Sequence, residues 1–96
     1  MRVISKKPLR DFWQRHPESK GLLEEWFKKA SKCAANSFPQ LRQTFGSADY
    51  VDGMTIFDVG GNRYRLAAVI HYDKQRLYVR HVMTHAEYDR HDWRKP

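Results

Sequence analysis

Apolar residues recur at helical spacing in two stretches near the start of the chain. Leu9, Phe12 and Trp13 follow an i, i+3, i+4 pattern. Pro8 suits the first turn of a helix, and Pro17 disfavours helix in the residue before it, so this helix should lie between them. A second stripe follows directly and predicts a longer amphipathic helix, with apolar members Leu22, Leu23, Trp26, Phe27, Ala30, Cys33 and Ala34.

The second half of the chain has the shorter period of β-strands. The sequences Gly60-Gly61-Asn62 and Asp73-Lys74-Gln75 interrupt the apolar runs and are typical of turns. A short strand is also expected near the start of the chain, where Val3 and Ile4 are β-branched. The predicted strands therefore cover residues 2–5, 54–59, 63–72 and 76–83.

The remaining segments are a connection and a short final helix. Residues 36–49 contain Pro39 and Gly46, and we expect an irregular connection that apolar side chains anchor to the core. Thr84 followed by Glu87 fits a capping box, which predicts a helix beginning at His85, with residues 92–96 frayed. The element order is β-α-α-β-β-β(-α). We expect an α+β fold with a small, mainly antiparallel sheet and two helices on one face.

Size and charge narrow the functional classes. A chain of 96 residues is too short for two independent cores, so we expect one domain over 1–96. No run approaches the ~20 apolar residues of a membrane span, and the start does not resemble a signal peptide. We therefore expect a soluble, cytoplasmic protein with no membrane partner. The formal net charge is +7, of which +6 lies in residues 1–48 (ten basic, four acidic) and favours a polyanionic partner.

Candidate chemistry concentrates in the last predicted strands and the helix attached to them. Cleavage of an RNA backbone needs a base for the 2′-hydroxyl, cations for the charged phosphorane and an acid for the leaving oxygen. Arg, His and Tyr side chains supply all three functions without a metal ion, and Arg is the best phosphate clamp. The residues that adjacent strands could bring together are Asn62, Arg63, Arg65, Arg80, His81, His85, Tyr88 and Asp89.

Plainer interpretations of these residues stay open. The arginines could be ordinary solvated charges, and Tyr88 a packing aromatic. His81, His85 and Asp89 recur every four residues, but a predicted helix cap between them disfavours a zinc site. The single Cys33 excludes an intramolecular disulfide and is expected to be a small buried residue rather than a nucleophile.

The tyrosines and the remaining histidines also have both functional and structural interpretations. Stacking on RNA bases is open for some tyrosines, although packing in the core is expected for at least two of them. The tyrosines in question are Tyr64, Tyr72, Tyr78 and Tyr88. His16, His71 and His91 are expected to have no functional role.

The second half of the chain resembles a known protein family. The segment IFDVGGNRYRLAAVIHYDKQRLYVRHVMTHAEYD, residues 56–89, resembles the HigB toxins of the RelE/ParE superfamily, above all in its GGNRYRL and VMTHAEYD motifs. The resemblance covers nearly the whole chain, because the expected N-terminal strand and two helices also fit a RelE-like fold. It implies a toxin of a type II toxin-antitoxin system, an mRNA endonuclease that commonly acts on translating ribosomes.

The resemblance also implies roles for individual residues. Arg65 matches the strand arginine that RelE-like enzymes place on the scissile phosphate, His85 falls where relatives have a basic residue, and Tyr88 falls near their C-terminal tyrosine. The middle strand lacks the paired lysines of some relatives, so His85 is our choice of general base. Arg80 is added to the catalytic set from its expected position. Contacts with RNA phosphate are expected from Asn62, Arg63, Arg76 and His81.

The resemblance implies partners as well as an activity. A cognate helix-turn-helix antitoxin of the HigA type would hold the toxin inactive, and operator DNA would be bound only through that antitoxin. The other expected partners are mRNA and the ribosome, with no cofactor and no metal ion. Two alternatives stay open at this stage: a ParE-like toxin that binds a topoisomerase, and a noncatalytic module that binds nucleic acid.

Overall fold

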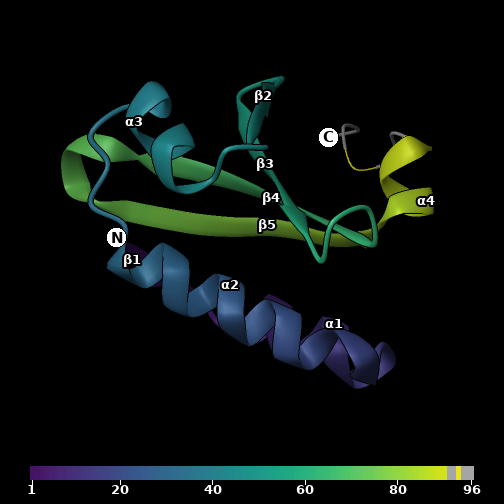
Figure 1. Ribbon diagram of the computed structural model, residues 1–96. Coiled ribbons are helices and arrows are strands. Elements are labelled where there is room, and N and C mark those ends of the chain that lie inside the picture. The colour runs from purple at the N-terminus through teal and green to yellow at the C-terminus, as the bar shows by residue number, and fades with distance from the viewer. Residues whose placement is uncertain (91–92, 94–96) are drawn as a thin grey trace.

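The computed structural model describes residues 1–90 and 93, which form a twisted sheet with helices around it (Figure 1). The first half contains strand β1 (Arg2–Ile4) and helices α1 (Lys7–Arg15), α2 (Lys20–Lys32) and α3 (Phe38–Thr44). The second half contains strands β2 (Asp49–Val51), β3 (Met54–Val59), β4 (Tyr64–His71) and β5 (Arg76–Thr84), and helix α4 (His85–Asp89). Single 3₁₀ turns cover Pro17–Ser19 and Tyr72–Lys74. Among the described residues, no helix is long and apolar enough to cross a membrane.

The five strands form one mixed sheet in the order β1-β5-β4-β3-β2. Strand β1 runs parallel to β5, and the other three pairings are antiparallel. This arrangement confirms the predicted α+β class and the mainly antiparallel sheet. The predicted turns are also confirmed: Gly60 and Gly61 have φ of 66° and 68°, and Gln75 has φ of 52°.

The prediction of an irregular connection over 36–49 was wrong, because helix α3 lies within it. Ser37 is the N-cap, and its side-chain oxygen accepts a hydrogen bond from the backbone N–H of Gln40 at 3.3 Å. Pro39 lies in the first turn, where its missing N–H has no consequence. The predicted anchoring to the core is confirmed, since Leu41 is completely buried and Phe45 is buried at the helix end.

Strand β2 was not predicted either. It forms a two-residue hairpin with β3, in which Val51 pairs with Met54 across Asp52 and Gly53. Both turn residues have positive φ, 52° and 82°, the combination that a type I′ turn requires. The Asp-Gly pair is a strong hairpin signal, and the sequence interpretation did not use it.

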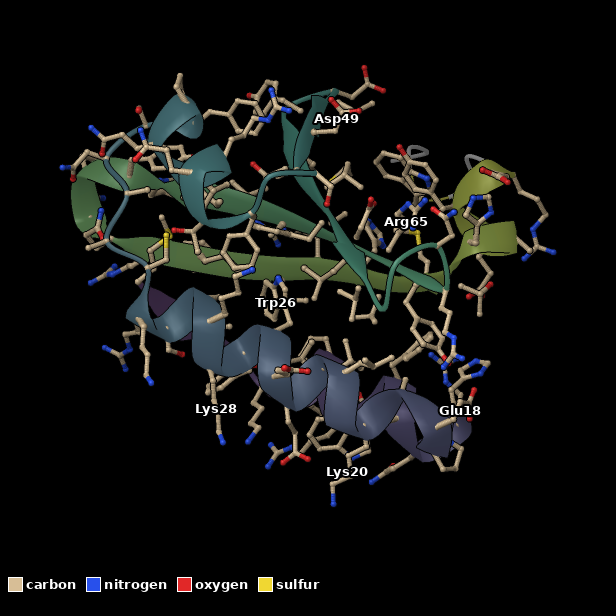
Figure 2. The ribbon with its side chains drawn as sticks, viewed as in Figure 1. Glu18, Lys20, Trp26, Lys28, Asp49 and Arg65 are labelled. Atoms are coloured by element: carbon tan, nitrogen blue, oxygen red, sulfur yellow. The ribbon has the colours of Figure 1, made fainter. Side chains whose placement is uncertain are left out.

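Alternation along the strands separates the two faces of the sheet. One face packs against α1, α2 and the apolar side chains of α3, and Figure 2 shows Trp26 of α2 directed at it. The buried apolar strand residues of this face are Phe57, Val59, Tyr64, Leu66, Ala68, Leu77 and Val79. The opposite face carries a smaller buried cluster, formed by Ile56, Ala67, Met83 and Trp93.

Candidate functional site

The predicted chemical residues gather at one end of the face that α1 and α2 leave uncovered. Arg65 pairs with Met83 and Ala67 with His81, so the side chains of Arg65 and His81 share this face. Helix α4 follows β5 directly and adds Tyr88, which packs against the small cluster. Figure 2 shows Arg65 on the side of the sheet away from α2, close to α4.

Arg65 is held by the protein itself. Its Nε lies 3.1 Å from Oδ1 of Asp58, its partner across the β3–β4 pair. Its Nη1 donates hydrogen bonds to the carbonyl oxygens of Gly61 at 3.3 Å and Tyr64 at 3.1 Å. Its Nη2 donates to Oδ1 of Asn62 at 3.4 Å. The residue is only 9% exposed, so the guanidinium is fixed in the β3–β4 turn with limited access to solvent.

An aromatic group lies beside the guanidinium. The ring centre of Tyr88 is 5.7 Å from Cζ of Arg65, within the range of a cation–π contact. Trp93 stacks on Tyr88 with ring centres 5.3 Å apart, and its indole N–H donates to the Tyr88 carbonyl oxygen at 3.1 Å. Trp93 is 6% exposed, so the predicted fraying is wrong at this residue; the other residues of 92–96, and His91, lie outside the described residues.

Helix α4 begins with the predicted capping box, which is confirmed. The backbone N–H of Glu87 donates to Oγ1 of Thr84 at 3.2 Å, and the backbone N–H of Thr84 donates to Oε1 of Glu87 at 2.9 Å. The bond from the Thr84 backbone is the main cause of the lowered pKa of Glu87. The N–H of His85 also donates to the carbonyl oxygen of Arg63 at 3.1 Å, which ties the helix to the β3–β4 turn.

His85 and Asp89 form a close pair along one side of α4. Nδ1 of His85 lies 2.9 Å from Oδ2 of Asp89, and the two side chains are 45% and 60% exposed. A carboxylate at this distance favours the tautomer that carries a proton on Nδ1, which leaves Nε2 as a proton acceptor. The pair therefore has the chemistry of an oriented, solvent-accessible general base.

His81 has a different environment from His85. Burial lowers the pKa of His81, and the neighbouring positive charge of Arg80 lowers it further. The ring of His81 is 6.5 Å from that of Trp93. At neutral pH His81 is therefore an uncharged imidazole beside the aromatic group, which can accept or donate a hydrogen bond but adds no positive charge.

The other predicted residues lie farther away or point elsewhere. Arg63 is exposed in the turn, and Arg80 is the exposed extra residue of a β-bulge between the Ala67 and Ala68 pairings. Arg76 pairs with His71 at the opposite end of β4, six residues from Arg65 and thus roughly 20 Å away at 3.3 Å per residue. The structure therefore places Asn62, Arg65, His81 and Tyr88 around the small cluster, has His85 on the helix that carries Tyr88, and leaves Arg76 apart.

Residues noted for other chemistry have clear structural positions. Tyr64 is buried on the helix-covered face, and its hydroxyl donates to Oε1 of Glu18 at 3.0 Å, so its ring is not available to RNA bases. Cys33 is buried in the main core, as predicted. Within the part of the chain that the structure describes, His81, His85 and Asp89 do not belong to a group of three or more potential metal ligands.

Sequence reasoning missed three parts of this site. Asp58 was not recognised as the partner of Arg65, Asp89 was included in the candidate cluster but not recognised as the partner of His85, and Trp93 was assigned to a frayed end. A signal existed for Asp89, because it follows His85 by one helical turn. Asp58 becomes recognisable only when the β3–β4 register is known.

Comparison with known proteins gives consistent matches over most of the chain. Residues 19–91 match the HigB toxin family, described as the RelE-like toxic component of a toxin-antitoxin system. The mRNA interferase toxin HigB of Escherichia coli strain K12 is 35% identical over 92 residues, which cover 93% of this chain and 88% of that protein. The mRNA interferase HigB of E. coli O6:H1 is 29% identical over 93 residues, or 94% of this chain and 90% of that protein.

Proposed function

This chain belongs to the HigB toxin family of RelE-like toxic components, and from that premise we propose that it cleaves mRNA on translating ribosomes without a metal ion. It is the toxin of a toxin-antitoxin system and an mRNA endoribonuclease, like its relatives named mRNA interferase HigB. The proposal adds the ribosome, the chemical route and the residues that act.

The observation that carries the proposed mechanism is the His85–Asp89 pair, with 2.9 Å between Nδ1 and Oδ2. With its proton on Nδ1, His85 accepts the 2′-hydroxyl proton of the ribose at Nε2. The 2′-oxygen then attacks the adjacent phosphorus, and the bond from phosphorus to the 5′-oxygen breaks. The products are a 2′,3′-cyclic phosphate and a 5′-hydroxyl. General base catalysis of this kind contributes roughly 100- to 10,000-fold in rate.

Arg65 and Tyr88 complete the proposed catalytic set. The guanidinium lies 5.7 Å from the Tyr88 ring, so both groups can approach the same phosphate. Arg65 stabilises the negative charge that grows on the phosphorane, and the Tyr88 hydroxyl gives its proton to the departing 5′-oxygen. Arg80, Arg63 and His81 hold neighbouring phosphates, and Asn62 acts through its hydrogen bond to Arg65.

The partners follow from the family and the charge of the chain. The chain has an antitoxin partner and an mRNA substrate, as a toxin of such a system does. We propose further that the antitoxin is a HigA-like helix-turn-helix protein, that operator DNA is bound only through it, and that the toxin acts in the cytoplasm. The net charge of +7 favours ribosomal RNA as a docking surface, with affinity that falls as salt rises.

Single-turnover cleavage of a defined message tests the proposal, with the message either bound to programmed ribosomes or naked. We expect fast cleavage only on ribosomes, fragments ending in a 2′,3′-cyclic phosphate and a 5′-hydroxyl, and no loss of the chemical step when metal ions other than those that hold the ribosome together are removed. Equal cleavage of naked message would contradict ribosome dependence. Fragments with a 3′-hydroxyl and a 5′-phosphate would contradict attack by the 2′-oxygen.

A further inference from the structure

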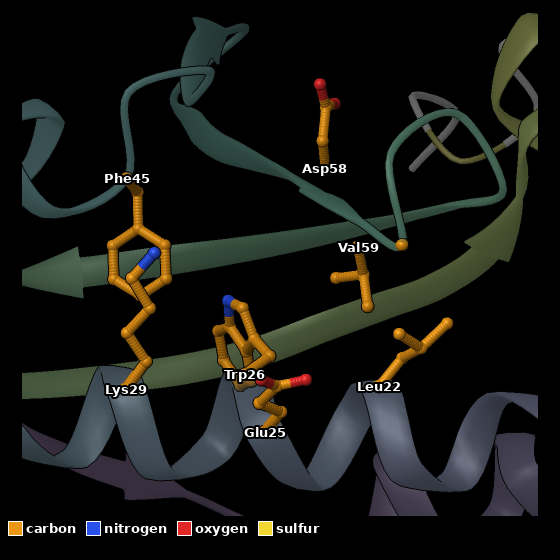
Figure 3. A pocket seen from close by; sticks show the side chains of 8 residues that line it. Leu22, Glu25, Trp26, Lys29, Phe45, Asp58 and Val59 are labelled. Atoms are coloured by element: carbon orange, nitrogen blue, oxygen red, sulfur yellow. The ribbon is translucent and has the colours of Figure 1, made fainter.

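A groove lies on the helix side of the sheet, away from the site described above. It runs between α2 and the end of β3, and has a volume of about 200 Å³ (Figure 3). Pockets for drug-sized ligands have roughly 300–1,000 Å³, so this one suits one or two side chains. Its lining is Leu22, Glu25, Trp26, Lys29, Phe45, Asp58, Val59 and Gly60.

The edge of β3 beside the groove is open. Strand β2 pairs with β3 only from Met54 to Ile56, and among the described residues no other strand pairs with that side of β3 beyond Ile56. Val51 and Met54 close a two-residue hairpin, so Met54 and Ile56 direct their backbone N–H and C=O groups toward β2. By the same alternation, the backbone N–H and C=O of Asp58 point outward at the open edge.

Trp26 supplies a second, independent feature of this groove. The residue is 5% exposed, and its indole N–H is buried without a hydrogen-bond partner. Figure 3 shows the indole nitrogen on the side of the ring away from α2, toward the sheet. A buried donor without an acceptor is costly, so native proteins seldom keep one unless a water molecule, a ligand or a partner supplies the acceptor.

The ends of the groove are well defined. A side chain at Gly60 would place its Cβ 2.6 Å from Cδ1 of Leu22, so the β3–β4 turn rests directly on α2. At the other end, the Lys29 ammonium lies 4.9 Å from the ring centre of Phe45. Lys29 is exposed and flexible, so its side chain can move aside and leave a positive charge at the rim.

We propose that this groove binds an extended segment of the antitoxin, which adds to the sheet as a strand along β3. The segment pairs with the backbone of Asp58 and inserts an apolar side chain between Trp26 and Val59. One of its oxygens accepts a hydrogen bond from the indole N–H of Trp26. An acidic residue of the segment lies near Lys29. The proposal rests on the assignment of the chain as a toxin with an antitoxin partner.

A polypeptide fits this place better than RNA does. An unpaired strand edge matches the hydrogen-bonding pattern of another strand, and the lining of the groove offers a phosphate Lys29 together with the acidic residues Glu25 and Asp58. Because the groove and the Arg65 cluster lie on opposite sides of the sheet, the segment anchors the antitoxin without covering the cluster.

Hydrogen exchange of the unmodified toxin, alone and in complex with its co-expressed antitoxin, tests the strand addition. We expect the Asp58 amide to exchange at least about tenfold more slowly in the complex. A stable complex in which the Asp58 amide exchanges as in the free toxin would overturn the proposal. So would equal protection by added RNA, or by raising the concentration of toxin alone, because RNA or a second copy would then be the occupant.

Two substitutions test the side-chain contacts. Trp26→Phe keeps an aromatic ring and removes the N–H, and should weaken antitoxin binding about three- to tenfold. Lys29→Glu should weaken binding to a similar extent, whereas the matched control Lys32→Glu, an exposed residue of α2 outside the groove, should not. If both test variants bind the antitoxin with unchanged affinity, the proposed contacts of Trp26 and Lys29 are wrong.

The proposed function and the proposed docking site would fail in different experiments. If no antitoxin neutralises the chain, or the purified protein does not cut mRNA, the proposed function fails. If the antitoxin binds and neutralises normally while the groove variants and the Asp58 amide are unaffected, only the docking site is wrong. Folding of each variant is checked by its thermal unfolding, and the variants should still cleave mRNA, because none of these residues lies in the proposed catalytic set.

Discussion

The two faces of the sheet are built from neighbouring residues of the same strands and carry different properties. Phe57 pairs with Leu66 on the helix-covered face, and both are at most 1% exposed. One residue along, Asp58 pairs with Arg65 on the opposite face and forms an ion pair there. Side chains of a strand alternate between faces, so a single hairpin stabilises the core with one set of residues and positions charged groups with the other.

The two faces should therefore respond differently to substitution, one through stability and the other through activity. Residues on the helix-covered face are packed against α1, α2 and α3, and their removal should unfold the protein. On the opposite face the exposed polar side chains, such as His85 and Asp89, contribute little burial. Arg65 belongs to both categories, because it is nearly buried and yet lies in the proposed catalytic set.

The largest effect is expected from His85→Ala. Loss of the general base should slow cleavage of ribosome-bound mRNA by roughly 100- to 10,000-fold, with little change in thermal stability because the side chain is half exposed. Single-turnover cleavage measures the rate. The control is His71→Ala on the same face at the far end of β4, which should cut normally. A folded His85→Ala protein that cuts at the wild-type rate would remove His85 from the mechanism.

On the other face, Phe57→Ala should destabilise the protein by about 3–5 kcal/mol, the usual cost of emptying a large aromatic site. Phe57 contacts the rings of Trp26 and Phe45 at 5.3 and 4.9 Å, and neither neighbour can easily fill the space. Urea denaturation gives the free energy of unfolding. Tyr50→Ala, at a position that is 60% exposed, should change it by less than about 0.5 kcal/mol. Comparable losses in the two variants would contradict the assigned core.

Arg65→Lys should reduce both the stability of the protein and its rate of mRNA cleavage. The loss of stability should be smaller than that caused by Phe57→Ala. Lysine keeps the charge but cannot reproduce the contacts to Gly61, Asn62 and Tyr64, so we expect a loss of about 1–3 kcal/mol in unfolding free energy. Cleavage should also slow. Unfolding and single-turnover cleavage are measured on the same preparations, with Arg10→Lys, at an exposed position of α1 outside the site, as the control. A stable variant with slowed cleavage would limit Arg65 to chemistry, and a destabilised variant with normal cleavage would limit it to structure.

The smallest effect concerns the pKa of His81. Burial is the main cause of its lowered pKa and Arg80 the second, so Arg80→Gln should raise that pKa only partway to its ordinary value. Because the folded protein binds this proton less well than the unfolded chain does, the contribution of His81 to stability falls as the pH drops below its ordinary pKa. NMR titration of the imidazole measures the shift. A pKa that falls, or does not move, would show that Arg80 does not act on His81.

Local sequence signals sufficed where the structure depends on near neighbours. The stripe in α2, the glycine turn at 60–61 and the Thr84–Glu87 capping box were all readable, because each needs only residues a few positions apart. Helix α3 and strand β2 were missed although Ser37, Pro39 and the Asp52-Gly53 pair signal them. Both elements are short, and the apolar periodicity that guided the prediction has no room to develop in them.

The site was only partly predictable for a different reason. Arg65, His81, His85 and Tyr88 were selected by residue type and family motif, and the structure places Arg65, His81 and Tyr88 around one small cluster with His85 on the adjoining helix. That Arg65 is held by Asp58 depends on strand register, which is a long-range property. Arg76 lies on the same strand as His81, but it begins β5 and pairs with His71, which puts it at the end of the sheet far from Arg65.

The position of β1 has a consequence for when the toxin becomes active. Strand β1 lies beside β5, with Arg2 opposite Arg76, so the sheet closes only after a long loop of chain has been made. His81, His85 and Tyr88 also belong to β5 and α4. During synthesis the early helices emerge first and have no complete sheet to cover. The growing chain should therefore be harmless until β5 is released, and an antitoxin already present in the cell can meet the toxin as its last strand folds.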